Sequence, residues 1–570
     1  MPDFSRLTRF TARRFVPDNF DPADWPQIET LYDQLVERNL GSAPALEAFL
    51  RDWSEFDDAM DEDAKRRYIA MTCQTDDQAA VDAYKFLVTV ILPRQKPRAN
   101  ELEKHYLAAP ARQALLPARY ALLDRQLAAR AALFREANVP LETEQDLLTH
   151  EYQAIMGALT VQFDGAERTL AQMGPIMEET DRARREAAFR AVGERRYQER
   201  EKLDALFDQL RDLRAQMAAN ADYANYRDYM FDAMLRFDYT PADCFSFHSA
   251  VETHVVPLIQ KIYARRRAQM QLDSLRPWDT QPDPLGRPPL RPFKTARELI
   301  DGCARIFERV DPQLGSQFRQ LDDSGLLDLE NRKGKAPGGY QEFFNEARLP
   351  FIFMNAVGAQ YDVETLLHEG GHAFNALAAR SEWLGPYRHP PLEFAEVASM
   401  GMELIAADYL EEFHAPADAA RARNDHLEGI VTLLGWIATV DAFQHWLYTY
   451  PRHTQAERAA QWAQTYRRFN GAVDWRSLEH FLQTSWHRQL HIFEVPFYYI
   501  EYGIAQLGAL QVWRNLRQNR ADAVAAYRRA LAVGGSRPLP DIYAAAGIQF
   551  RFDAEIIAPL MEMLAKELAL

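Results

Sequence analysis

The feature that most constrains this chain is a short run in which two histidines lie four residues apart. It reads His368-Glu369-Gly370-Gly371-His372. On an α-helix, residues four apart lie about 40° apart around the axis, so both imidazoles can reach one metal ion. Glu369 projects beside them, where it can hold a metal-bound water. Two neutral imidazoles and a carboxylate beside the water are the groups that a zinc hydrolase needs.

The residues around the two histidines favour a helix with one buried face. Asp362 is a suitable N-cap, and Glu364 suits the first helical turn. Apolar residues recur at helical spacing and predict a buried stripe. They are Val363, Leu366, Leu367, Ala373, Phe374 and Leu377. Gly370 and Gly371 should each cost the helix about 1 kcal/mol relative to alanine, which is acceptable if they let another element or a peptide approach closely.

A zinc site of this kind needs a third protein ligand, and the spacing tests where it lies. The longer pattern with a third histidine would need that residue at position 378, which is Ala378. A glutamate 19 positions after His372, as in the zinc aminopeptidases, would fall on Pro391. Both classes are therefore excluded.

Three glutamates follow on a predicted helix that begins near Pro391 and runs to about Phe413. They are Glu393, Glu396 and Glu403. The last two are two helical turns apart on one face, and the first lies near that face. Apolar residues interleave with them, so the helix should be largely buried, and a buried carboxylate needs a partner such as a metal. The residues alone leave the choice among these glutamates open.

The two segments together resemble the M3 zinc oligopeptidases, the group of thimet oligopeptidase and oligoendopeptidase F. The resemblance is carried by His368-Glu369-Gly370-Gly371-His372 and by Phe394-Ala395-Glu396-Val397-Ala398-Ser399. In that family the third ligand lies 24 positions after the second histidine, which implies Glu396. The implied metal ligands are therefore His368, His372 and Glu396, holding one Zn²⁺ per chain. The resemblance also implies that Glu403 orients a ligand imidazole.

Other segments resemble the bacterial oligoendopeptidase branch, and the similarity runs from about residue 160 to the end. They are 161–165, 167–170, 338–340 and 350–355. Two positions depart from the family pattern. Gly370 stands where a larger residue is usual, and Gln341 follows the Gly-Gly-Tyr run where a cysteine is expected. Neither is a zinc ligand, so both departures concern substrate fit and helix rigidity.

A zinc peptidase also needs hydrogen-bond donors for the oxyanion of its tetrahedral intermediate. Tyr498 and Tyr502 are four apart, although tyrosines at this spacing are often core residues. In the M3 family a histidine followed by a tyrosine cluster binds the substrate and stabilises the transition state. The resemblance therefore implies His491, Tyr498 and Tyr502, in that order, with Tyr499 as an alternative.

Local patterns predict the remaining elements. Residues 339–344 and 350–355 read as two short strands that lead into the zinc helix, where an edge strand could pair with a substrate backbone. Residues 111–136, 203–213 and 519–532 favour helix. The proline-rich segment 277–292 predicts an exposed loop.

Composition excludes some classes of function. The net charge of −16 over 570 residues argues against nucleic acid as a partner, because phosphate binding needs a basic surface. Cys73, Cys244 and Cys303 are odd in number and widely spaced, which indicates reduced thiols and a cytoplasmic protein. The N-terminal residues lack an apolar signal core, and no apolar run of about 18 residues predicts a membrane span.

We therefore predict a mainly α, large helical zincin-type peptidase with a small β-sheet beside the zinc helix. An N-terminal helical region would cover residues 1–165, and a catalytic region residues 166–570. The resemblance implies a deep channel that admits short unfolded peptides. The expected activity is zinc-dependent hydrolysis of internal peptide bonds, with Glu369 as the general base on the zinc-bound water.

Two alternatives stay open. One is a peptidyl-dipeptidase of the same family, which would need a cationic or amide pocket for the terminal carboxylate. The other is a non-catalytic helical scaffold with a structural zinc. A structural site usually has a fourth protein ligand, and the nearby candidates His389 and Glu393 do not make a convincing one. The oligomeric state and the cleavage-site preference are not determined by these patterns.

Overall fold

The computed structural model describes residues 4–336 and 338–570, which form two compact units. Unit 1 comprises the chain up to Glu136, then Arg291–Ala420 and Gly508–Phe550, and unit 2 comprises Ala137–Leu290, Arg421–Leu507 and Arg551–Leu570. Helices dominate both units, as predicted. Each unit combines segments from both predicted regions, 1–165 and 166–570, and the division at residue 165 stays a prediction.

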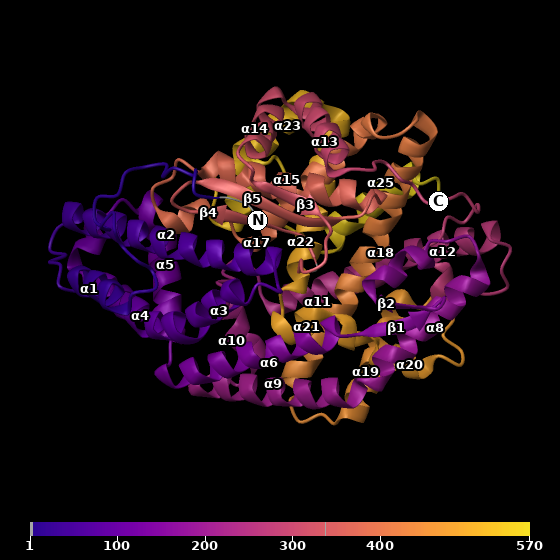
Figure 1. Cartoon of the computed structure of the whole chain (residues 1–570), viewed down its shortest axis with the longest axis horizontal. Helices are drawn as coiled ribbons and strands as arrows, with labels where there is room; N and C mark the ends of the chain where they lie inside the picture. The colour runs from indigo at the N-terminus through magenta and orange to yellow at the C-terminus, as the bar shows by residue number, and fades with distance from the viewer. Residues whose placement is uncertain (1–3, 337) are drawn as a thin grey trace. The chain divides into compact units, whose positions relative to one another are not determined.

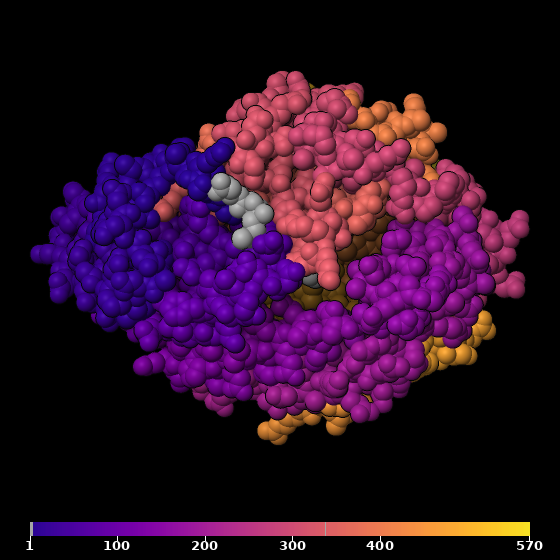
Figure 2. All heavy atoms as spheres, in the orientation of Figure 1, coloured from indigo at the N-terminus to yellow at the C-terminus, as the bar shows by residue number. Residues whose placement is uncertain are grey.

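Unit 1 is built from helices that pack around two features, an N-terminal core and a small sheet. The helices are α1 (Trp25–Val36), α2 (Ala43–Cys73), α3 (Gln78–Phe86), α4 (Leu92–Ala108), α5 (Pro117–Leu133), α13 (Ala296–Val310), α14 (Pro312–Asp323), α15 (Gln360–Ala379), α16 (Gly385–Arg388), α17 (Leu392–Ala406), α23 (Arg520–Leu531) and α24 (Leu539–Ala545). Helices α1, α2, α4 and α5 share one apolar core, which also includes Leu384, just before α16, and Tyr387 within α16. Figure 2 shows these N-terminal helices in indigo and violet on the surface of the unit.

A three-stranded sheet in unit 1 leads directly into the helix that carries the two histidines. Its strands are β3 (Leu327–Glu330), β4 (Tyr340–Phe344) and β5 (Leu349–Ala356). The central strand, β5, pairs antiparallel with β4 and parallel with β3 (Figure 1). Tyr340 lies opposite Phe353, and their rings stack with centroids 4.6 Å apart. The two predicted strands are thus confirmed, β4 is an edge strand, and β3 is an addition that the patterns did not predict.

Helix α15 begins immediately after β5, and its first turn differs from the prediction. Gly358, with φ +88°, makes the tight turn between the two elements, in the left-handed region that favours glycine. The helix starts at Gln360, so Asp362 is not its N-cap. The Asp362 carboxylate instead accepts hydrogen bonds from the N–H groups of Val357 (2.9 Å) and Ala359 (2.8 Å). A carboxylate in the first turn can accept hydrogen bonds from the N–H groups that precede the helix. An N-cap carboxylate also accepts from free N–H groups, which is why an aspartate here suggested a cap.

Unit 2 contains most of the remaining helices and a short hairpin. The helices are α6 (Val139–Gly157), α7 (Gly174–Met177), α8 (Arg182–Gln198), α9 (Arg200–Asn220), α10 (Tyr226–Ala233), α11 (Pro241–Ala250), α12 (Val256–Gln269), α19 (Gln455–Asn470), α20 (Glu479–Thr484), α21 (Leu490–Glu494) and α25 (Ala554–Glu567). The hairpin joins β1 (Thr160–Phe163) to β2 (Ala166–Thr169) through Asp164 and Gly165, both at positive φ. An Asp-Gly pair suits this two-residue turn.

Two helices have residues in both units, namely α18 (Pro416–Thr449) and α22 (Tyr499–Gln518). Helix α18 is the one helix among the described residues that is long and apolar enough to cross a membrane by length and composition. However, 61% of its most apolar window is buried inside the protein, which is typical of a core helix.

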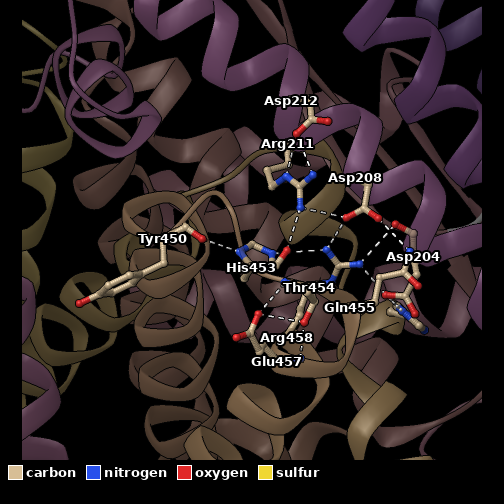
Figure 3. A network of polar contacts seen from close by, with 11 residues as sticks. Asp204, Asp208, Arg211, Asp212, Tyr450, His453, Thr454, Gln455, Glu457 and Arg458 are labelled. Atoms are coloured by element: carbon tan, nitrogen blue, oxygen red, sulfur yellow. Dashed lines mark hydrogen bonds and ion pairs between the residues drawn. The ribbon is translucent and has the colours of Figure 1, made fainter.

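A buried arginine of α19 forms ion pairs with α9 within unit 2 (Figure 3). The Arg458 side chain is fully buried, and its guanidinium donates hydrogen bonds of 2.7 Å to the carboxylates of Asp204 and Asp208. At the start of α19, Thr454 and Glu457 form a capping box. Because the arginine has charged partners on the neighbouring helix, its burial is compensated.

The proline-rich segment after α12 is only partly the exposed loop that its composition predicts. Its first residues form a short 3₁₀ turn, Pro277–Asp279, in which Trp278 and Asp279 are buried. The Asp279 carboxylate accepts hydrogen bonds from Arg182 and Arg185 of α8, which explains the burial. Residues 285–288 are exposed, as expected.

Candidate metal centre and active site

Two helices of unit 1 bring three predicted metal ligands together. His368 and His372 lie on α15, and Glu396 lies on α17. One nitrogen or oxygen atom from each residue lies within 4.8 Å of the others. Oε2 of Glu396 is 3.4 Å from Nε2 of His368 and 3.6 Å from Nε2 of His372. Two imidazole nitrogens and a carboxylate oxygen are a donor set that suits Zn²⁺, so these residues fit the metal that the motif predicts.

The two helices approach each other closely because position 371 is a glycine. A Cβ atom added to Gly371 would lie 2.5 Å from the carbonyl oxygen of Ala398 and 2.6 Å from Cα of Ser399. Both atoms belong to the backbone of α17, which cannot give way as a side chain can. A Cβ atom at Gly370 would lie 2.5 Å from the end of the Phe307 ring. The second glycine therefore permits the helix contact that brings Glu396 to the histidines.

Two residues of α17 hold the candidate ligands in position. Nδ1 of His368 donates a hydrogen bond of 2.6 Å to Oε1 of Glu403, which leaves Nε2 directed toward Glu396. The Ser399 hydroxyl donates a hydrogen bond of 3.0 Å to Oε2 of Glu396. The sequence patterns assigned no role to Ser399, although its position three residues after Glu396, within one helical turn, was a usable signal.

The surroundings shift the pKa values of the three candidate ligands in different directions. Burial lowers the pKa of His372 to about 4, which keeps this imidazole neutral and able to bind a metal. Burial also disfavours the charged form of His368, but the carboxylates of Glu396 and Glu403 outweigh it and raise its pKa well above the usual value. Burial opposes ionisation of Glu396, yet the two histidines and Ser399 lower its pKa to about 2. Glu396 is thus ionised, and its carboxylate favours a positive charge at the histidines beside it.

Glu369 has the environment expected of a group that exchanges protons. Its side chain is buried, and burial raises its pKa to about 7. Among the described residues, no hydrogen-bond partner reaches its Oε2 atom. A Cβ atom added to Gly339, just before β4, would lie 3.8 Å from Oε1 of Glu369, so the edge strand begins beside this carboxylate. A buried acceptor without a protein partner is suited to hold a water molecule.

Within the part of the chain that the structure describes, the converging group contains three protein ligands and no fourth. His389, one of the two spare candidates, instead lies with its Nε2 atom 3.2 Å from Oδ1 of Asn345. Glu393 is buried on α17 but is not a member of the group. A three-ligand site leaves a coordination position for water or substrate, whereas structural zinc sites are usually closed.

The predicted oxyanion donors form a cluster of their own in unit 2. The His491 ring lies 5.7 Å from the rings of Tyr498 and Tyr502 and 4.9 Å from the ring of Tyr499, measured between centroids. Nε2 of Gln489 donates a hydrogen bond of 2.7 Å to Nδ1 of His491. In a neutral imidazole this leaves the proton on Nε2, which lies 3.5 Å from the Tyr502 hydroxyl. His491 therefore presents an N–H donor next to three phenols.

Tyr498 lies just outside the helix that carries its neighbours. Helix α22 begins at Tyr499, and Phe497 has a positive φ of 69°. Tyr498 is the residue immediately before the helix, where its carbonyl accepts a hydrogen bond of 3.0 Å from the N–H of Glu501, so it lies about one turn from Tyr502. Their rings still lie 5.2 Å apart between centroids, so both remain in the cluster around His491.

Comparisons with known proteins agree on one family. The model of peptidase family M3 matches residues 176–562. An oligoendopeptidase F homolog from Borreliella burgdorferi is 25% identical over 256 residues, which are 43% of this chain and 42% of the relative. Oligopeptidase PepF from Bacillus subtilis is 22% identical over 300 residues, 51% of this chain and 44% of the relative. The chain thus spans less than half the length of each of these two curated relatives.

Solved structures match over the full length. A structure of PZ peptidase A with an inhibitor has a TM-score of 0.91 and 27% identity, covering 98% of this chain and 99% of that one. An X-ray structure of a candidate oligoendopeptidase F has a TM-score of 0.91 and 28% identity, with the same coverage. Because the family model spans more than half of the sequence and the fold agrees throughout, this protein belongs to peptidase family M3, a family of metallopeptidases.

Proposed function

We propose that this protein is a zinc-dependent endopeptidase that hydrolyses internal bonds of short, unfolded peptides. The observation that carries the proposal is the convergence of His368, His372 and Glu396 within 4.8 Å on two helices, beside the buried carboxylate of Glu369. Relatives described as oligoendopeptidase F and oligopeptidase PepF support the preference for oligopeptides. The restriction to short peptides rests on the resemblance, which implies a deep channel.

In this proposal His368, His372 and Glu396 hold one zinc ion, and Glu403 keeps the His368 ring in its binding orientation. When bound, the zinc supplies Lewis acidity to the water and to the peptide carbonyl. Glu369 acts as the general base and then as the general acid. Its carboxylate accepts the proton of the attacking water and passes it to the leaving amine, and a pKa raised by burial suits both steps.

Two further features would position the substrate. Strand β4 is an edge strand that begins beside Glu369, so a peptide backbone could add to it in extended form. This pairing fixes the direction of the peptide and does not depend on its side chains. Nε2–H of His491 and the hydroxyls of Tyr498 and Tyr502 would donate hydrogen bonds to the oxyanion, with Tyr499 as the alternative phenol.

The test is the Glu369→Gln variant, assayed on fluorogenic peptides graded by length. We expect this variant to bind one zinc per chain at the active site and to fold normally, but to lose nearly all turnover, because an amide cannot accept the proton. The matched control is Glu364→Gln, which changes a glutamate on the same helix outside the ligand group. Turnover at the wild-type rate by Glu369→Gln would refute the proposed mechanism.

A second assay separates endopeptidase from peptidyl-dipeptidase action. The same peptides are prepared with a free and with an amidated C-terminus, and the products are identified by mass spectrometry. An endopeptidase should cleave both forms at internal bonds at similar rates. Release of C-terminal dipeptides from the free form alone would instead assign the alternative activity.

A further inference from the structure

A second cluster of metal-binding side chains lies in unit 2, where neither the motif nor the proposed function uses it. Cys244 and His248 lie four residues apart on α11. Asp441 and His445 lie four residues apart on α18. Residues at this spacing share a helical face, so each helix presents a pair of potential ligands.

The two pairs meet in the interior of the unit. One ligand atom each from Cys244, Asp441 and His445 lies within 4.8 Å of the others, the same convergence that His368, His372 and Glu396 show in unit 1. Nε2 of His445 is 3.4 Å from Oδ2 of Asp441. His248 contacts the same carboxylate oxygen, with its Nε2 atom 2.7 Å from Oδ2 of Asp441.

Several polar atoms of this cluster are buried without a protein partner. Cys244 and Asp441 have no exposed surface, and His445 is 3% exposed. Over residues 4–336 and 338–570, Oδ1 of Asp441 and both ring nitrogens of His445 lack a hydrogen bond. A buried polar atom left unsatisfied destabilises the folded protein, and most such atoms in proteins have a partner. Oδ1 of Asp441 and Nδ1 of His445 therefore call for a ligand that the protein itself does not provide, and Nε2 of His445 has only its 3.4 Å contact with Asp441.

We propose that Cys244, Asp441 and His445 bind a second zinc ion, which joins α11 to α18. Sulfur, imidazole nitrogen and carboxylate oxygen are all established zinc donors, at about 2.0–2.3 Å from the ion. On binding, the Cys244 thiol loses its proton to solvent and bonds the ion as a thiolate. One thiolate, one carboxylate, one neutral imidazole and Zn²⁺ sum to zero charge, which suits a fully buried site.

The surroundings of the cluster fit an ion that a substrate does not reach. The hydrogen bond from His248 occupies Oδ2 of Asp441 and leaves Oδ1 for the metal, so His248 is a positioning residue. The rings of Phe245 and Phe497 lie 4.9 and 5.4 Å from the His445 ring, between centroids, and form an apolar wall. The cluster supplies three ligands, so a water molecule would complete a tetrahedral coordination. A buried site behind such a wall has no access for a peptide, in contrast to the candidate active site of unit 1.

Cobalt substitution tests the proposal on the full chain. The candidate active site contains two histidines and a glutamate but no cysteine, so it cannot produce a thiolate-to-cobalt charge-transfer band. The protein is expressed in zinc-poor medium supplemented with Co²⁺, and its cobalt content and near-ultraviolet absorption are measured. We expect two cobalt ions per chain and a thiolate charge-transfer band. One ion per chain and no such band would overturn the proposal and leave the cluster as a polar part of the core.

Two variants identify the sulfur ligand. Cys244→Ser should remove the band and one of the two ions, whereas Cys303→Ser, at another buried free cysteine, should keep both. If Cys244→Ser does not fold, zinc X-ray absorption of the wild-type protein replaces it, because of the two candidate ligand groups among the described residues only this cluster contains sulfur. Persistence of the band in a folded Cys244→Ser protein would contradict the assignment.

A third variant keeps this inference separate from the proposed function. His372→Ala should lose the active-site ion and the peptidase activity but retain the thiolate band. An active wild-type enzyme that holds one ion and gives no band would leave the peptidase proposal intact and refute the second site alone.

Discussion

Nδ1 of His368 lies 2.6 Å from Oε1 of Glu403, one helix away, and this contact turns the opposite ring nitrogen toward Glu396. The carboxylate thus acts on the metal site through the imidazole. It fixes which nitrogen carries the proton and how the ring is oriented, both of which determine the geometry of a metal ligand.

Glu403→Gln should therefore weaken zinc binding without removing a ligand. An amide oxygen still accepts the hydrogen bond but lacks the charge, so we expect a loss of about 10–100-fold in zinc affinity. The measurement is competition with a fluorescent chelator. Glu393→Gln, at a buried glutamate of the same helix outside the ligand group, should retain wild-type affinity. If Glu393→Gln loses more zinc than Glu403→Gln, our ligand assignment is wrong.

Gly371→Ala should push α15 and α17 apart. The added Cβ atom would lie 2.5 Å from the carbonyl oxygen of Ala398, a backbone atom that can move only with its helix. Overpacking of this kind typically costs about 1–3 kcal/mol, and the displaced Glu396 should bind zinc more weakly. Chemical denaturation and zinc titration measure the two effects.

The control for Gly371→Ala is Gly429→Ala, in the helix α18, where an added Cβ atom meets nothing within 4 Å. Alanine favours a helix over glycine by about 1 kcal/mol, so this variant should be as stable as the wild type or more stable. Equal behaviour of the two variants would count against the close approach of α15 and α17.

Arg458→Met should destabilise the protein strongly. The arginine is fully buried beside the carboxylates of Asp204 and Asp208 (Figure 3), and removing it takes away a charged partner that both share, although Arg211 stays beside Asp208. Breaking a buried ion pair from one side typically costs about 3–5 kcal/mol, which denaturant unfolding can measure. Arg476→Met, at an exposed arginine paired with Asp474, should leave the unfolding midpoint unchanged. A small effect of Arg458→Met would mean that water replaces the lost partner.

The cluster around His491 should contribute to turnover and not to zinc binding. If His491 stabilises the oxyanion, His491→Ala should lower kcat by about 10²–10³-fold, the usual effect of losing one such donor. Zinc content and the melting temperature should stay near those of the wild type. Wild-type kcat in this variant would exclude His491 from the oxyanion site.

Phenylalanine at positions 498, 499 and 502, one at a time, decides which phenol takes part. Each change removes only a hydroxyl group and keeps the ring packing around His491. The variant whose kcat falls most, with KM little changed, identifies the donor. We expect Tyr498→Phe or Tyr502→Phe, because the family resemblance favours these positions.

Much of the fold could be predicted from local patterns. The apolar stripe of the zinc helix is buried, and β4 and β5 form the two strands that their aromatic and β-branched residues indicated. Strand β3 was missed because Leu327–Glu330 is too short to show a period, and because its partner β5 is not the next strand in the sequence. Asp279 was missed for a similar reason. A polar residue in a proline-rich segment reads as exposed until Arg182 and Arg185 are seen to bind it.

The sequence by itself determined the helix with its two histidines, because residues four apart lie on the same face of a helix. It also determined that buried glutamates follow. Only the tertiary structure decided which glutamate lies beside the Nε2 atoms of both histidines, because the answer depends on how closely α17 approaches α15 at Gly371. The pairs Cys244–His248 and Asp441–His445 likewise depend partly on sequence and partly on tertiary structure. Each pair is visible in the sequence, but almost 200 residues separate them, and packing of the two helices alone makes them one candidate site.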